Sequence, residues 1–210
     1  MPRAILIVWM TMLLVITSAA ISFAQQNPAA GGQGPGGRGG APPQPLRLVS
    51  PAFADGATLP AKYTCAAGQD AVSPPLRWIN PPGTRDMGTF ALIVHDLEPR
   101  PQKHVDDILH WMVWNIPSTA EEFPEGISST TTDLPDGSHQ TNGNPGQGGV
   151  VGYRPPCPPQ NVQVPHHYIF ELFALDTRTD LPANASRADL LKMMDGHIVA
   201  HASLIAPFSR

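Results

Sequence analysis

The sequence predicts a mostly β domain in which sheets pack face to face, with helix near the C-terminus. Three observations lead to this fold class. Short apolar segments of strand length recur along the chain. Turn-forming residues separate them, and the chain holds 25 prolines and 19 glycines. One segment, near residue 186, carries a clear helix-start signal. Many short strands and little helix are typical of a sheet sandwich.

The expected strands are segments in which apolar and branched residues alternate or run together. Residues 88–96 form an apolar run, as expected for a strand that is buried on both faces. Within residues 166–176, Tyr168, Phe170 and Leu172 fall on one face of a strand. The strands are therefore expected at residues 47–53, 59–64, 88–96, 108–116 and 166–176.

The expected helix begins after Ser186, whose side chain can cap it, with Asp189 as the capping-box partner three residues on. Leu190, Leu191 and Met194 follow at helical spacing, and a glycine then interrupts the pattern. One or two further helical turns are expected within residues 197–204.

The N-terminal residues carry the pattern of a secretory signal peptide. Arg3 precedes an apolar run over residues 5–21, and Ser22 and Ala24 place small residues before the expected cut. Residues 1–24 are therefore expected to be removed, which leaves a periplasmic or secreted protein without stable membrane insertion. The alternative is an uncleaved anchor, because the apolar run nearly reaches membrane-spanning length. No cysteine lies near the cut, which argues against a lipoprotein anchor.

A segment rich in glycine and proline, residues 25–45, is expected to be a disordered tether, because it cannot bury enough apolar surface to offset its ordering entropy. The folded domain is then expected over residues 46–210. Export also bears on Cys65 and Cys157, the two cysteines of the chain, because an oxidising compartment allows a disulfide. The alternative is two buried free thiols; we favour the disulfide.

Composition and motifs argue against several functions. A net charge of −4 with 14% charged residues argues against nucleic-acid binding, which typically requires a basic surface. There is no G-x-S-x-G nucleophile motif, and the Gly-rich residues 143–149 lack the Lys-Ser/Thr of a phosphate loop. His197 and His201 have the helical spacing of a zinc pair, but Ile198 stands where the catalytic glutamate would be. Two histidines without metal are the favoured interpretation there.

Residues 95–111 concentrate acids and histidines around one strand connection. Asp96 and Glu98 lie two apart in an extended segment, so both carboxylates can face the same side. His110 falls in the next strand and can come to lie beside Asp96, which would orient the ring and favour its protonated form. Protonated histidine offers N–H donors to an anion. His104, Asp106 and Asp107 are expected to be exposed.

Four interpretations of this cluster stay open from the residues alone. A metal site would use Asp96, His110 and His166, although their spacing matches no known ligand pattern. A general acid–base pair would need a nucleophile or an electrophile stabiliser beside it. An anion pocket needs only donors and a shaped wall. In the fourth interpretation, Asp96 closes a turn and His110 is a satisfied core histidine.

Six motifs occur in a fixed order: SPPLRW (73–78), FALIVHDLEP (90–99), HWMVWNIP (110–117), GYRPPCPP (152–159), PHHYIFELFALD (165–176) and Gly-His (196–197). This order resembles the phosphatidylethanolamine-binding protein family, in its bacterial Raf-kinase-inhibitor-like branch. The resemblance covers the folded unit. It implies a large central antiparallel sheet packed on a smaller sheet, helices near the C-terminus, and a small pocket for anions and phosphorylethanolamine-like headgroups.

Carried over position by position, the resemblance assigns the pocket to Asp96, Glu98, His110, Pro158, Pro159, His166 and Tyr168, with Tyr153 at the rim. The motifs also depart from the family pattern. Leu97 stands for a proline, Glu98 for an aspartate and His167 for an arginine, and Phe208 lacks the phenol oxygen of the terminal tyrosine.

The sequence as a whole favours an exported binding protein without catalytic residues, metal or other cofactor. It would capture a small anionic or phosphorylated ligand, with His110 as donor and Asp96 orienting it. Glu98 would contact an amine, and His166 and Tyr168 would close the site. One alternative is a protein-binding inhibitor, for example of a protease. Another is a hydrolase or metalloenzyme that uses the same residues.

Overall fold

The computed structural model describes residues 45–80, 87–99, 107–141, 151–160 and 164–210. The chain divides into two units, residues 1–40 and 41–210, and every described element belongs to the second. The expected signal peptide and nearly all of the expected tether, the Gly-rich residues 143–149, His104 and Asp106 lie outside the described residues. Within the described ranges, no helix is long and apolar enough to span a membrane.

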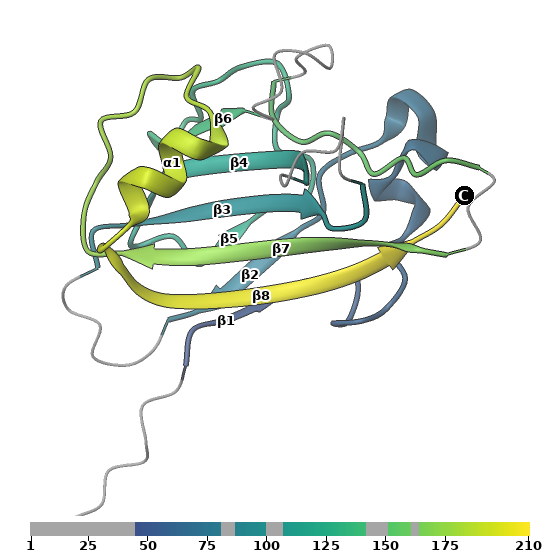
Figure 1. The fold of residues 1–210 in the computed structure, drawn as a ribbon, viewed down its shortest axis with the longest axis horizontal. Coiled ribbons are helices and arrows are strands. Elements are labelled where there is room, and N and C mark those ends of the chain that lie inside the picture. The colour runs from purple at the N-terminus through teal and green to yellow at the C-terminus, as the bar shows by residue number, and fades with distance from the viewer. Residues whose placement is uncertain (1–44, 81–86, 100–106, 142–150, 161–163) are drawn as a thin grey trace, which may run out of the picture. The chain divides into compact units, whose positions relative to one another are not determined.

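Two antiparallel sheets form the domain, which confirms the mostly β prediction (Figure 1). The larger sheet has the strand order β6-β4-β3-β7-β8. Its strands are β3 (Thr89–Asp96), β4 (Ile108–Pro117), β6 (His139–Thr141), β7 (His166–Leu175) and β8 (Ile198–Phe208). The smaller sheet, in the order β1-β2-β5, contains β1 (Arg47–Val49), β2 (Leu76–Ile79) and β5 (Glu122–Phe123). The helical elements are η1 (Ala61–Tyr63), η2 (Cys65–Asp70) and α1 (Arg187–Met194).

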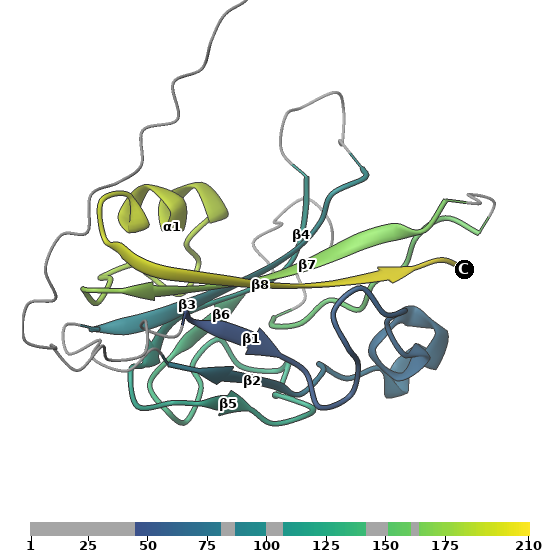
Figure 2. The same cartoon turned by 90° about the horizontal axis from the view of Figure 1, so that it is seen from below.

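The larger sheet is covered on both faces, as the apolar run of β3 predicts. Alternate residues of a strand face opposite sides. Leu92 and Val94 therefore belong to the core shared with the smaller sheet, whereas Ala91 and Ile93 belong to the core beneath α1. Figure 2 shows α1 on one side of the larger sheet and β1, β2 and β5 on the other. Every residue of β3 is buried, so this strand is the centre of both cores.

The α1 helix starts as the sequence predicts. The Ser186 side chain accepts a hydrogen bond from the backbone nitrogen of Asp189, and the Asp189 carboxylate accepts one from the backbone nitrogen of Ser186. This capping box satisfies donors that a helix start leaves unpaired. Leu190 and Met194 are buried against the sheet, but Leu191 faces solvent.

The helical turns expected within residues 197–204 are wrong, because residues 198–204 belong to β8. Ala202, Leu204, Ala206 and Phe208 are buried at every second position, which is the period of a strand. In a strand, residues four apart lie about 13 Å from each other. His197 lies in the turn before β8 and His201 lies within β8, so the prediction that both lie on one helix face fails as well. Instead, His197 pairs with Asp176 and His201 with Glu171.

Two further boundaries differ from the sequence prediction. The first strand ends at Val49, since Pro51 soon follows and lacks the N–H that pairing requires. Residues 59–64 are not a strand: the segment forms the 3₁₀ turn η1 directly after Pro60. The fixed φ of proline suits the start of such a turn.

Candidate ligand-binding site

A cavity of about 210 Å³ lies at one end of the larger sheet, where β3 ends and β4 and β7 begin. The segment from residue 154 to residue 159 forms its other wall. Its lining consists of Asp96, Pro99, Ile108, His110, Arg154, Pro155, Cys157, Pro158, Pro159 and His166. The structure thus brings together five of the residues that the sequence assigns to a pocket: Asp96, His110, Pro158, Pro159 and His166.

Two larger hollows lie elsewhere on the domain. One, of about 510 Å³, lies between residues 46–55 and 202–204, and the other, of about 490 Å³, lies within residues 120–136. The charged residues of both, such as Arg47 and Glu122, are exposed. The small cavity instead borders three buried ionisable side chains, Asp96, His110 and His166. Buried ionisable groups that converge on a cavity are characteristic of functional sites, so we take the smaller cavity as the candidate site.

A β-bulge places His110 in this cavity. Val94 pairs with Trp111 across the ladder and His95 with Leu109, so His110 is the extra residue of β4. Leu109 then faces the core beneath α1, while Trp111 faces the core between the sheets. The extra residue lets His110 lie on the same side of the sheet as Trp111, although the two are adjacent. Bulges commonly redirect one side chain next to a binding site in this way.

The ring of His110 has a fixed tautomer. Its Nδ1 lies 2.8 Å from the carbonyl oxygen of Arg154, which can only accept, so Nδ1 carries the proton. Burial lowers the pKa of His110 to about 4, so the ring is neutral near pH 7 and Nε2 is an acceptor. This Nε2 is buried and has no hydrogen-bond partner among the described residues. An unpaired buried polar atom beside a cavity is a candidate ligand contact.

Arg154 brings a positive charge to the cavity wall, and the sequence analysis did not single it out. Its backbone nitrogen donates to the carbonyl oxygen of His110, 2.8 Å away, so the two residues are joined by two hydrogen bonds. Its guanidinium also lies close enough to act on the pKa of His110 and of Tyr168, lowering both. The sequence did offer a signal for this role, because Arg154 is the one basic residue of the GYRPPCPP motif, two of whose prolines were assigned to the pocket.

Asp96 pairs with His166 rather than with His110, which corrects the sequence expectation. Oδ2 of Asp96 lies 2.8 Å from Nδ1 of His166, and both side chains are almost fully buried. The cross-strand partner of Asp96 on β7 is Tyr168, two residues from His166, so the carboxylate and the imidazole share one face of the sheet. Burial raises the pKa of Asp96, although the hydrogen bond from His166 opposes this effect. Asp96 therefore orients His166, while a backbone carbonyl orients His110.

Glu98 does not line the cavity, contrary to its expected role as a ligand contact. Its carboxylate accepts a hydrogen bond from the backbone nitrogen of His167, at 2.6 Å, and lies 2.6 Å from Nδ1 of the same residue. Burial opposes ionisation, but the hydrogen bonds from His167 prevail and lower the pKa of Glu98. Glu98 and His167 are two departures from the family motifs, and the structure makes them partners.

The two tyrosines lie behind the cavity rather than in its lining. The hydroxyl of Tyr153 donates to the carbonyl oxygen of Tyr63, 2.8 Å away, and its ring packs edge-on against Trp111. Tyr168 is fully buried, with its ring edge-on to His110 at 5.1 Å and stacked on His166 at 6.5 Å between centroids. Burial raises the pKa of Tyr168. In this arrangement Tyr168 supports both histidines.

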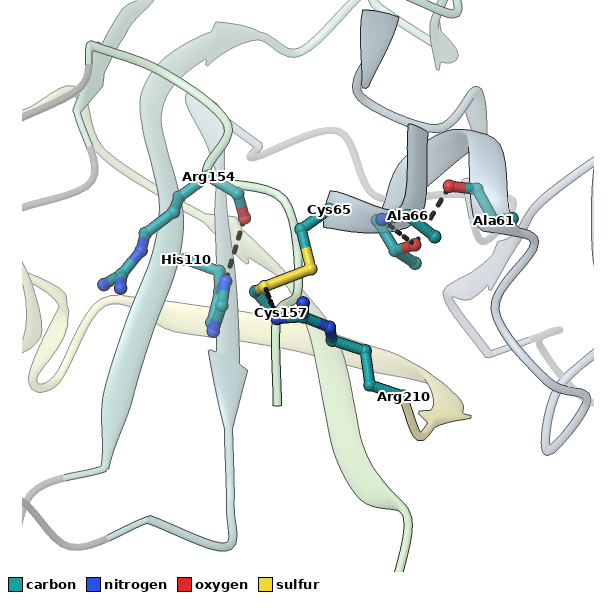
Figure 3. Close-up of a disulfide and its surroundings, with 8 residues drawn as sticks. Ala61, Cys65, Ala66, His110, Arg154, Cys157 and Arg210 are labelled. Atoms are coloured by element: carbon teal, nitrogen blue, oxygen red, sulfur yellow. Dashed lines mark hydrogen bonds between the residues drawn. A yellow bond between two sulfur atoms is a disulfide. The ribbon is translucent and has the colours of Figure 1, made fainter. Parts of the chain in front are cut away.

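A disulfide ties the cavity wall to the helical turns before β2. Cys65, at the start of η2, bonds to Cys157, and their Cα atoms lie 5.2 Å apart (Figure 3). Cys157 lines the cavity between Pro155 and Pro158. Figure 3 also shows His110 and Arg154 beside this disulfide. Because prolines have few backbone states and the disulfide removes more, this wall is held in one shape.

Asp107 is not solvated, which corrects another expectation. Its side chain is 9% exposed and contacts Arg187 of α1 and Nδ1 of His95, the latter at 2.5 Å. The other ring nitrogen of His95 lies 3.1 Å from the carboxylate of Glu171. This charged cluster, His95, Asp107, Glu171 and Arg187, lies across the sheet from the cavity. It joins β3, β7 and α1 immediately behind Asp96.

Ligand-type atoms of Asp96, Glu98 and His166 lie within 4.8 Å of one another. These atoms already bond within the protein, since Asp96 is paired with His166 and Glu98 with His167. His110 is not part of the group, so the structure does not assemble the alternative site of Asp96, His110 and His166. In this structure the three side chains form part of a hydrogen-bonded network.

Comparisons with known proteins agree with the order of the sequence motifs. The family model described as "Phosphatidylethanolamine-binding protein" matches residues 49–209. A UPF0098 protein of Methanothermobacter thermautotrophicus is 38% identical over 165 residues, covering 79% of this chain and 99% of its own. A Mycobacterium tuberculosis protein named "Putative lipoprotein LppC" is 32% identical, covering 79% of this chain and 73% of its own.

Solved structures give the same relationship. The crystal structure of CT736 from Chlamydia trachomatis, described as a homologue of the same family, has a TM-score of 0.62 and 30% identity, covering 79% of this chain and 98% of its own. Escherichia coli YbcL, described as a member of the mammalian PEBP family, has a TM-score of 0.64 and 25% identity, covering 80% of this chain and 99% of its own. This likeness fits the bacterial branch that the motifs indicate. The chain belongs to the phosphatidylethanolamine-binding protein family.

Proposed function

We propose that this domain is a binding protein that reversibly captures a small anionic or phosphorylated ligand in the cavity between β3, β4, β7 and residues 154–159. The observation that carries the proposal is the pairing of Arg154 with His110 at the cavity. Arg154 supplies a positive charge to the lining, and His110 supplies a buried ring nitrogen without a partner among the described residues. Arginine is well suited to oxyanions because its planar group offers several N–H donors.

The size of the cavity supports a small ligand or headgroup. At about 210 Å³ it falls below the usual range of cavities for drug-sized molecules. The wall of Pro155, Pro158 and Pro159, held by the disulfide of Cys157, favours a pre-formed site. A pre-formed site costs little ordering entropy when a ligand binds.

Binding rather than catalysis is proposed because the lining offers no evident nucleophile. Among the described residues around the cavity there is no serine, threonine or lysine, and Cys157 is bonded to Cys65. The Asp96–His166 pair alone resembles a catalytic base with its orienting group, but such a pair needs a nucleophile or a substrate-activating group to act on.

Export is part of the proposal. The apolar N-terminal run with small residues before position 25 supports a periplasmic or secreted protein. The lipoprotein name of the mycobacterial relative points in the same direction. The disulfide agrees with an oxidising compartment, where such bonds persist.

The test is calorimetric titration of inorganic phosphate and O-phosphorylethanolamine into the protein purified from the full-length chain. The expected result is saturable binding that weakens about tenfold or more in Arg154→Gln, since a hydrogen bond to a charged group contributes about 1.5–3 kcal/mol. Arg77→Gln is the matched control, because Arg77 lies on the smaller sheet and, among the described residues, its guanidinium forms an exposed ion pair with Glu122.

The absence of saturable binding at millimolar ligand would overturn the proposal. Equal weakening by Arg154→Gln and Arg77→Gln would also contradict it, because binding would then follow overall charge rather than the cavity. In either case a protein target for this domain becomes the stronger function, and capture of a protease by the Arg154→Gln variant would support it.

A further inference from the structure

We propose that the cavity selects oxyanions that still carry a proton: hydrogen phosphate and singly protonated phosphate monoesters, over sulfate and phosphate diesters. This inference rests on the proposed function and names the ligand class of the same site. The observation that carries it is that two buried groups of the lining, Nε2 of His110 and the carboxylate of Asp96, are hydrogen-bond acceptors.

The tautomer of His110 decides what the ligand must offer. Because Nδ1 donates its proton to the carbonyl oxygen of Arg154, the neutral ring has a lone pair at Nε2. A fully deprotonated oxyanion has only lone pairs of its own, so the two atoms would repel each other. A ligand hydroxyl can donate to Nε2 and satisfy an acceptor that has no partner among the described residues.

Asp96 imposes the same requirement. Its Oδ2 accepts from His166 and its Oδ1 accepts from the backbone nitrogen of Glu98, so the structure uses it as an acceptor at both oxygens. A carboxylate with 4% side-chain exposure repels a second anion unless a proton lies between them. A hydroxyl on the ligand provides this proton, while Arg154 compensates the remaining negative charge.

Sulfate could bind without repulsion if Nε2 of His110 were protonated, but this protonation is unfavourable. Burial holds the pKa of this ring at about 4. Its charged neighbours act in both directions: Arg154 and His95 disfavour the imidazolium, and Asp107 favours it. At pH 7 a group with this pKa is protonated in about one molecule per thousand. Sulfate would bind through this minor form, whereas hydrogen phosphate carries its own proton.

The sharpest test compares two probes of the same shape and charge. At pH 7.5 both sulfate and hydrogen phosphate are tetrahedral dianions, but only hydrogen phosphate has a hydroxyl. We expect phosphate to bind the wild-type protein about ten- to a hundredfold more tightly than sulfate, the range that a buried unpaired acceptor implies. Calorimetry or competition for a bound probe measures this ratio.

Two further probes separate free phosphate monoesters from lipid-type headgroups. Methyl phosphate has a second pKa near 6, typical of a phosphate monoester, so lowering the pH from 7.5 to 5.5 should strengthen its binding. Dimethyl phosphate has no ionisable hydroxyl and represents the diester of a phospholipid. It should bind weakly at both pH values.

Variants distinguish selectivity from general loss of binding. His110→Gln supplies an amide that can donate as well as accept, so the phosphate-to-sulfate ratio should fall toward one. Arg154→Gln should weaken both anions while leaving their ratio close to that of the wild-type protein. A purely structural role of His110 would change both affinities together and leave the ratio unchanged.

Each outcome is decisive. Tight phosphate binding with weak sulfate binding, lost selectively in His110→Gln, supports the inference. Equal affinities for phosphate and sulfate in the wild-type protein overturn it while leaving anion capture intact. Tighter binding of dimethyl phosphate than of methyl phosphate at pH 5.5 also overturns it and indicates a lipid headgroup. Failure of every probe to bind overturns the proposed function and this inference with it.

Discussion

His110 and Arg154 are joined by two hydrogen bonds: Nδ1 of His110 donates to the carbonyl oxygen of Arg154, and the backbone nitrogen of Arg154 donates to the carbonyl oxygen of His110. This reciprocal contact attaches the proline-rich wall to the bulge of β4. It also fixes the tautomer of His110, which, unlike His166, has no carboxylate partner among the described residues. Four predictions concern the parts of the domain that hold this arrangement in place.

The first prediction is that His110 makes the domain less stable in acid. The pKa of His110 is about 4 in the folded protein, against 6.5 as the ordinary value. As the pH falls through this window, the unfolded chain takes up a proton that the folded protein does not. The contribution, about 3 kcal/mol in all, is present above pH 6.5 and lost toward pH 4.

Denaturant unfolding of wild-type protein and His110→Gln at several pH values measures this effect. The difference in unfolding free energy between the two should shrink as the pH falls from 6.5 to 4. His197→Gln, at an exposed histidine, is the matched control. A constant difference across the window would show that His110 titrates normally in the folded protein.

The second prediction has the opposite sign and concerns His95. Burial acts to lower its pKa, but the hydrogen bonds with Asp107 and Glu171 prevail and raise it above 6.5. Its stabilising contribution is therefore complete below pH 6.5 and is lost as the pH rises through the folded-state pKa. Wild-type protein should lose unfolding free energy above pH 6.5, and His95→Gln should lose less over the same range.

Titration of the His95 ring by NMR provides an independent readout of this prediction. A midpoint above 6.5 is expected, together with a downward shift in Glu171→Gln, which removes one of the two carboxylates. A midpoint below 6.5 would mean that desolvation outweighs both carboxylates, and the predicted pH dependence would then reverse.

The third prediction is that the Cys65–Cys157 disulfide supports both stability and binding. The two cysteines are 92 residues apart, so the bond closes a long loop in the unfolded chain. Its removal in the double variant Cys65→Ser/Cys157→Ser should cost about 2–5 kcal/mol of unfolding free energy. Phosphate affinity should also fall, because Cys157 and Pro158 line the cavity. Unchanged affinity in a folded variant would show that the prolines alone hold the wall.

The fourth prediction concerns the turn that leads into the wall. Gly152 has a φ of +79°, and a Cβ there would lie 2.8 Å from Oε1 of Gln140, the atom that accepts a hydrogen bond from Trp111. Gly152→Ala should therefore cost more than the backbone strain of about 1–3 kcal/mol. Gly137→Ala is the matched control, because Gly137 has a φ of +85° and open space around it. Equal losses of unfolding free energy would mean that Gln140 moves aside at no cost.

The motif order was sufficient to predict the family fold and the gathering of Asp96, His110 and His166 at one cavity. The burial of β3 on both faces could also be predicted, because its residues form a continuous apolar run, and so could the shared face of Tyr168, Phe170 and Leu172 in β7, all of which are buried. The pairing of Asp96 with His166 was not readable. It depends on the register between β3 and β7, which sets Asp96 opposite Tyr168 and so beside His166. The bulge that directs His110 into the cavity likewise leaves no signal in the hydrophobic pattern.

Long-range partners explain the other differences between sequence and structure. Asp107 is buried because Arg187, 80 residues later, and His95 neutralise it. The apolar pattern of residues 198–208 is compatible with a helix as well as with a strand. The segment forms a strand because it pairs with β7. The role of Arg154 could not be predicted either, because it depends on a contact with His110, which is 44 residues away in the sequence.

The central claim is that the cavity bordered by His110, Arg154 and Asp96 binds an oxyanion. It is tested most directly by ¹⁵N NMR of the histidine rings during titration with inorganic phosphate. We predict a saturable shift at Nε2 of His110, a smaller one at His166, and none at His197. Phosphate binding without any shift at His110, or no binding at millimolar phosphate, would contradict the claim.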